Sequence, residues 1–71
     1  MTEDIAELLS AVPFHQFELT LSDRSSYVVD EPKRLGIPGH GRSVHYHESN
    51  GSRTILAVRH IVSVAVKAHA R

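Results

Sequence analysis

The sequence predicts a small, mainly β domain: five short antiparallel strands that close into a barrel, preceded by one N-terminal helix. Apolar and polar residues alternate in several short runs, which is the pattern of strands with one buried face. Turn-forming residues separate these runs at short intervals. The chain has 71 residues, enough for one domain spanning 1–71. Closing the strands into a barrel would leave no sheet edge exposed.

An amphipathic helix is predicted over about residues 2–12. Thr2 is a suitable N-cap, and the acidic residues that follow it suit the positive end of the helix dipole. Pro13 ends the helix, because the residue before a proline is disfavoured in helical geometry. Apolar residues recur at three- and four-residue spacing on one face, and they are Ile5, Leu8, Leu9 and Val12. This face is expected to cover one end of the barrel.

Five strands are predicted after the helix, over about residues 14–22, 26–30, 43–48, 53–58 and 61–67. The first strand alternates regularly, with Phe17 and Leu19 on its apolar face. In the last strand Val62, Val64 and Val66 alternate with smaller residues, and β-branched side chains favour a strand over a helix. Barrels of the SH3-like or Sm-like type are the architectures of this size that fit the pattern.

The segment 30–42 is predicted to be irregular, because prolines and glycines interrupt any regular element there. It is also the most basic part of the chain, with Lys33, Arg34, His40 and Arg42. A basic loop is usually just solvated. The competing interpretation is a phosphate contact, in which glycines let backbone N–H groups approach an anion. The glycine spacing matches no phosphate-binding loop fingerprint.

Composition limits the classes of function. Cysteine is absent, so disulfides and thiolate metal sites are excluded. A core this small gives marginal stability, and oligomerisation is therefore expected. The formal net charge is zero, so the chain lacks the basic footprint of a strong non-specific nucleic-acid binder. No signal peptide and no membrane-spanning apolar run is recognisable, which predicts a cytoplasmic protein without membrane association.

Two histidines raise the question of a metal. His45 and His47 project from one face of the third strand, and imidazoles at that spacing can share a metal ion. A site would need a further ligand such as His40 or Glu48. Histidines on the outer face of a strand are more often solvated, so no metal and no cofactor are predicted. Enzyme activity is not predicted either, because no nucleophile elbow, HExxH motif or Cys/His pair is present.

The run from Pro13 to Asp23, followed by an alternating strand and later by the His60-Ile61 step, resembles a family of small uncharacterised bacterial proteins. Its members show Pro-Phe, a second Phe, an Asp-Gly turn, a His-Pro-like dipeptide and a final apolar strand. The resemblance covers most of the chain and implies no activity. This chain departs from the pattern at Arg24, where the turn usually has glycine, and at Glu31, which replaces the histidine before proline.

The stretch from Val58 to Val64 is similar to the bacterial Sm-like RNA chaperone Hfq, which carries Tyr-Lys-His before its last strand. In that family the Lys and His line the pore of a ring-shaped hexamer and contact RNA bases. The resemblance implies that Arg59 and His60 do so here. Val58 replaces the tyrosine, and Tyr46 is the one nearby aromatic residue for base stacking.

Two classes of function remain. The first is a non-enzymatic, oligomeric Sm-like barrel that binds single-stranded RNA through Arg59 and His60. Further candidates for RNA binding are basic or aromatic residues: Tyr46, Lys33, Arg34 and Arg42. The second class is a protein-interaction or structural module that binds no nucleic acid. The neutral net charge and the shortage of aromatic residues favour the second class slightly. The first class makes the sharper prediction, because it assigns RNA binding to named residues.

Overall fold

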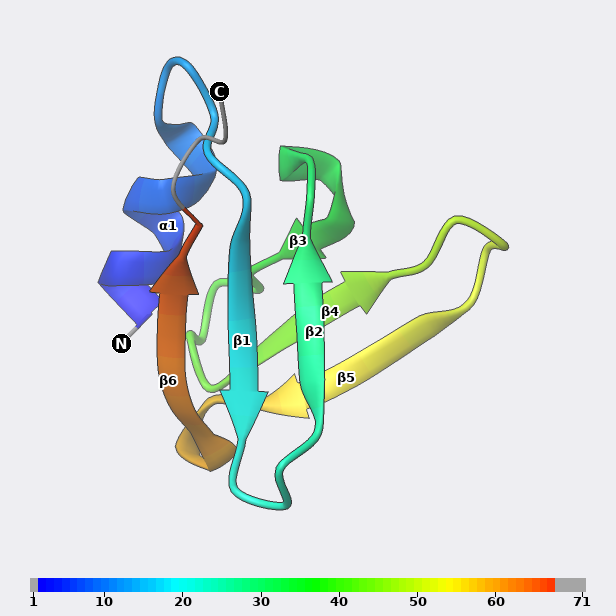
Figure 1. The fold of residues 1–71 in the computed structure, drawn as a ribbon. Helices are drawn as coiled ribbons and strands as arrows, with labels where there is room; N and C mark the ends of the chain where they lie inside the picture. Colours follow the sequence, from blue (N-terminus) through cyan, green and yellow to red (C-terminus); the bar gives the residue numbers. More distant parts are fainter. Residues whose placement is uncertain (1, 68–71) are drawn as a thin grey trace.

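The computed structural model describes residues 2–67 (Figure 1). In chain order the elements are α1 (Thr2–Ser10), β1 (Phe17–Leu21), β2 (Ser26–Val29), the 3-10 helix η1 (Pro32–Arg34), β3 (Leu35–Gly36), β4 (Ser43–His47), β5 (Arg53–Ala57), the 3-10 helix η2 (Val58–His60) and β6 (Ile61–Val66). The helix and the five strands expected from the sequence all lie within their predicted ranges; the first strand, predicted over 14–22, is much shorter than predicted, and the others are slightly shorter.

The strands form two separate three-stranded antiparallel sheets, with the orders β2-β1-β6 and β3-β4-β5. Figure 1 shows the strands of the second sheet running obliquely across those of the first. The predicted five-stranded SH3-like or Sm-like barrel is therefore wrong. The barrel does not close because no strand of one sheet pairs with a strand of the other: η1 separates β2 from β3, η2 separates β5 from β6, and all four of these strands are outer strands.

A sixth strand lies in the segment predicted to be irregular. Leu35 pairs with Tyr46 and Gly36 pairs with His45, which makes β3 the outer strand of the second sheet. The side chain of Leu35 is buried, so this short strand is fixed by packing as well as by pairing. The 3-10 helix η1 lies in the same segment, and the part after β3, from Ile37 to Arg42, connects β3 to β4 without regular structure.

The core lies between the two sheets and is closed on one side by α1, which lies alongside β6 (Figure 1). Its buried side chains are apolar and come from the helix and both sheets: Ile5, Phe17, Leu19, Val29, Leu35, Val44, Leu56 and Ile61. Opposed core residues are paired across strands, as Val44 is with Leu56. Within residues 2–67, no helix is long and apolar enough to cross a membrane.

The last strand differs from its predicted pattern. Val62 and Val66 are 59% and 52% exposed, whereas Ile61 is buried. A β-bulge explains Ile61 and Val62: Thr20 pairs with Ser63 and Leu21 pairs with Ile61, so Val62 has no partner in the ladder. Val66 lies beyond the bulge, opposite Phe17, at the end of the outer strand β6. A bulge adds one residue to one strand and disrupts the alternation of faces locally. The regular alternation of valines in the sequence gives no sign of it.

Candidate anion-binding site

The loop that carries Arg42 has a defined shape. Gly41 has φ +72, a left-handed conformation that glycine adopts without strain. Its N–H donates a hydrogen bond of 3.0 Å to the carbonyl oxygen of Pro38. The N–H of Arg42 donates to Nδ1 of His40 at 2.9 Å, and the hydroxyl of Thr2 donates to the carbonyl oxygen of Gly41 at 3.0 Å. The start of α1 therefore holds this loop in place.

Arg59 is brought to the same loop by η2. The N–H of Val58 donates a hydrogen bond of 3.0 Å to the carbonyl oxygen of Arg42, which ties the beginning of η2 to the beginning of β4. The two arginines line one depression of about 380 Å³, together with Gly41, Ala57 and Val58. We refer to this depression as the Arg42–Arg59 site. The pairing of β4 with β5 sets Ser43 opposite Ala57, and the hydrogen bond from Val58 to Arg42 continues this ladder, which brings the positions of the two arginines together.

The guanidinium groups of Arg42 and Arg59 are positively charged, both residues are exposed, and neither forms an ion pair within residues 2–67. Lys67, by contrast, has its ammonium 3.2 Å from a carboxylate oxygen of Glu18. Two unpaired guanidinium groups beside one depression make a site with positive potential, suited to an anion.

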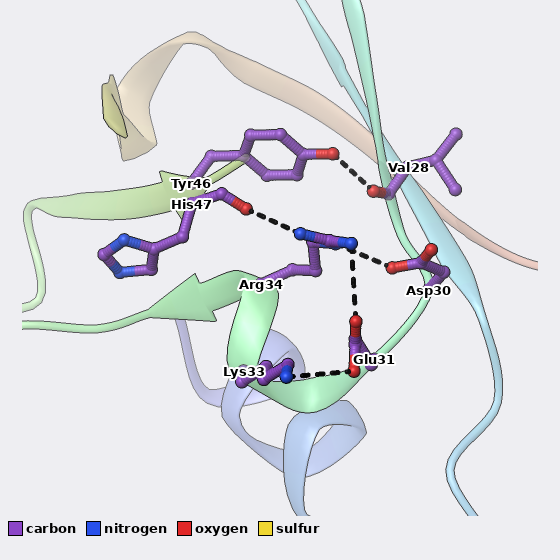
Figure 2. Close-up of polar contacts among 7 residues, drawn as sticks. All are labelled: Val28, Asp30, Glu31, Lys33, Arg34, Tyr46 and His47. Atoms are coloured by element: carbon purple, nitrogen blue, oxygen red, sulfur yellow. Dashed lines mark hydrogen bonds and ion pairs between the residues drawn. The ribbon is translucent and has the colours of Figure 1, made fainter. Parts of the chain in front are cut away.

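The other basic candidates lie at the opposite end of β4 and have partners there (Figure 2). Nε of Arg34 donates to the Asp30 carboxylate at 3.0 Å, and its Nη2 lies 3.4 Å from a carboxylate oxygen of Glu31. The hydrogen bond with Asp30 is the main reason why the pKa of Arg34 is raised. Nζ of Lys33 lies 3.8 Å from Glu31. These local carboxylates offset the positive charge of Lys33 and Arg34.

Tyr46 also has a structural role. Its hydroxyl donates a hydrogen bond of 2.8 Å to the carbonyl oxygen of Val28 (Figure 2). Its ring packs edge-on against Tyr27, with 5.1 Å between ring centroids. The structure therefore separates the six residues predicted to bind RNA into two groups. Arg42, Arg59 and His60 lie at one end of the molecule, and Lys33, Arg34 and Tyr46 lie at the other end of β4.

His60 lies next to the Arg42–Arg59 site, in a second depression of about 360 Å³. We call this depression the base hollow, and its lining residues include Leu21, Ser22, Asp23, Ile55, Ala57 and His60. The N–H of Ser22 donates to the carbonyl oxygen of His60 at 2.8 Å, and the hydroxyl of Ser22 lies 3.5 Å from Nδ1 of the ring. Ser22, Asp23 and Ile55 could not be predicted as site residues, because nothing in the sequence of a turn or an outer strand marks them as neighbours of His60.

The histidines of β4 do not assemble a metal site in the described part of the chain. His45 and His47 lie on the face opposite the buried Val44, as the alternation predicted. No group of three or more histidine, aspartate or glutamate side chains within residues 2–67 is arranged to hold a metal ion. Nδ1 of His40, named as a further ligand, accepts the backbone hydrogen bond of Arg42 instead.

No protein-family model, no curated protein and no solved structure matches this chain. The resemblance to the uncharacterised bacterial family and the resemblance to Hfq therefore stay predictions.

Proposed function

We propose that this protein is a non-enzymatic module that binds single-stranded RNA at the Arg42–Arg59 site, in the cytoplasm. The observation that supports the proposal is the meeting of two exposed, unpaired arginines at one depression. A guanidinium group binds a phosphate through two parallel hydrogen bonds and stacks on a flat base. Single-stranded RNA presents both groups to a small surface, whereas the bases of a duplex are stacked inside.

The charge of the chain limits the strength of this binding. The formal net charge is zero, so the affinity must come from the local site and not from a general attraction. Two arginine–phosphate contacts on a single strand predict a slope of about −1.4 in a plot of log K against log salt concentration. We therefore expect a modest affinity that decreases with added salt, unlike the steep dependence of strongly basic proteins.

The first test is native mass spectrometry of protein purified without nuclease, with the ratio of absorbance at 260 and 280 nm recorded. Co-purified RNA supports the proposal, and the same spectrum gives the number of subunits. The second test is fluorescence anisotropy with a labelled single-stranded oligoribonucleotide over a series of salt concentrations. Arg42→Ala and Arg59→Ala should each weaken binding and bring the slope closer to zero by about 0.7.

Arg53→Ala is the matched control, because Arg53 is an exposed arginine of β5 outside the Arg42–Arg59 site. It should leave both the affinity and the salt slope close to those of the wild type. The proposal fails if the wild type binds no RNA at low salt. It also fails if Arg53→Ala weakens binding as much as the two variants in the site.

A second candidate function is a protein-interaction module, and the unpaired outer edge of strand β6 favours it. β6 pairs with β1 on one side only, and its exposed residues include two large apolar side chains, Val62 and Val66. An apolar edge strand is a common place for another strand to add. This candidate is favoured if the purified protein carries no RNA but forms oligomers. It is also favoured if the protein binds a partner protein and Val66→Lys abolishes that binding.

A further inference from the structure

The base hollow adjoins the Arg42–Arg59 site. Ala57 lines both depressions. The base hollow is also lined by Ile55, Leu56 and His60. The Arg42–Arg59 site is also lined by Val58 and Arg59. The two depressions therefore lie side by side along one short segment.

The walls and the rim of the base hollow differ in chemistry. Leu21 and Ile55 give apolar walls, and Ile55 is 58% exposed, so described residues leave much of its side chain uncovered. Ser22, Asp23 and His60 supply polar atoms around these walls. A nucleobase has the matching chemistry, with apolar faces and hydrogen-bonding edges.

The carboxylate of Asp23 is held in a fixed position with one oxygen left over. Its Oδ1 accepts hydrogen bonds from the N–H of Ser25 at 2.9 Å and from the hydroxyl of Ser25 at 2.6 Å. Within residues 2–67, Oδ2 accepts no hydrogen bond from another residue. A positioned carboxylate oxygen accepts hydrogen bonds and repels the lone pairs of a carbonyl group.

We propose that the base hollow holds the base of the nucleotide whose phosphate lies between Arg42 and Arg59, and that Asp23 favours bases with an amino group over uracil. The proposal rests on the proposed function. Adenine, cytosine and guanine each present an exocyclic amino group that donates to a carboxylate. Uracil presents one N–H between two carbonyl oxygens, and both oxygens face repulsion from Asp23.

The test compares labelled oligoribonucleotides of equal length, one of uridine alone, one of adenosine alone and one of cytidine alone. The wild type should bind the adenosine and cytidine strands about tenfold more tightly than the uridine strand. Asp23→Asn keeps the Oδ1 acceptor that fixes the turn and replaces Oδ2 with an amide donor. This variant should lose the discrimination against uridine, or reverse it.

Two further variants separate this proposal from the proposed function. Arg42→Ala should weaken binding of all three strands by a similar factor and leave their order unchanged. Ile55→Ala, at a position that is 58% exposed and outside the buried core, should weaken all three by removing an apolar wall. Binding that depends on Arg42 and Arg59 but shows no base preference overturns the base hollow alone. A base preference that is unchanged in Asp23→Asn also overturns the base hollow alone. If the wild type binds no RNA, both proposals are overturned.

Discussion

The hydroxyl of Tyr46 in β4 donates a hydrogen bond of 2.8 Å to the carbonyl oxygen of Val28 in β2, and this bond connects the two sheets (Figure 2). β2 is the outer strand of its sheet, so the carbonyl group of Val28 lies where a closed barrel would have a further strand. A side chain takes the place of that strand here. The edge-on packing of Tyr27 against Tyr46 supports the same contact.

Removing this hydroxyl should reduce stability without changing RNA binding. Tyr46→Phe keeps the ring packing and deletes one hydrogen bond, so the free energy of unfolding should fall by about 1 kcal/mol. Urea denaturation followed by circular dichroism measures this change. Tyr27→Phe is the control, because within residues 2–67 the Tyr27 hydroxyl makes no hydrogen bond. Equal stabilities of the two variants would show that the bond between the sheets contributes nothing in solution.

Arg24 should be a position where glycine stabilises the protein. It has φ 74 in the turn between β1 and β2, a left-handed conformation that strains any residue with a β-carbon. Arg24→Gly should raise the free energy of unfolding by about 0.5–1 kcal/mol, because glycine adopts this conformation readily. Arg24→Ala removes the same charge and keeps the strain, so it serves as the control. A glycine variant no more stable than the alanine variant would contradict the prediction.

Stability should fall at acid pH partly through Glu18. Its pKa is lowered, first by a hydrogen bond with the Ser26 side chain and then by the hydrogen bond and charge of Lys67. A carboxyl whose pKa is lower in the folded state stabilises the protein above the pKa of the unfolded chain. This stabilisation is lost as the pH falls from the ordinary carboxyl range, about 4, through the folded pKa.

The measurement is the free energy of unfolding as a function of pH, for the wild type and for Glu18→Gln. The difference between them should be largest near neutral pH and should shrink as the medium becomes acidic. Lys67→Met should remove only part of the acid dependence, because the Ser26 contact persists. A constant difference between wild type and Glu18→Gln at every pH would contradict the assigned cause.

The sequence was sufficient for elements whose pattern is local. Phe17 and Leu19 alternate with polar residues and are buried, as predicted, and Val44 is buried in the same way. The Asn50-Gly51 dipeptide is likewise a local turn signal, because it readily adopts positive φ, and Gly51 has φ +94. The spacing along one strand or within one turn determines each of these features, so they need no knowledge of the remaining chain.

The arrangement of the sheets could not be predicted in this way, because it depends on contacts between distant residues. A bond from Tyr46 to Val28 and a bulge at Val62 have no local signature. The same holds for the Arg42–Arg59 site. The sequence marked both arginines as candidates, but they meet because of the register between β4 and β5 and the hydrogen bond from Val58 to Arg42 that continues it. It gave no reason to separate them from Arg34, whose charge is paired.

Ile5 should determine whether α1 is formed at all. It is the one residue of this nine-residue helix that is fully buried, and a helix so short is not stable without packing. Ile5→Val should cost about 1 kcal/mol in the free energy of unfolding, and Ile5→Ala about 3 kcal/mol. A domain this small has little stability to lose, so the valine variant is the one to measure by urea denaturation.

Ala6→Ser is the control for Ile5→Val, because Ala6 is exposed on the same helix and its substitution removes no core contact. The consequence extends to the Arg42–Arg59 site, since Thr2 at the start of α1 holds the loop that carries Arg42. Any variant that detaches the helix should therefore weaken RNA binding as well as folding. If Ile5→Ala folds and binds RNA as the wild type does, α1 neither completes the core nor positions Arg42.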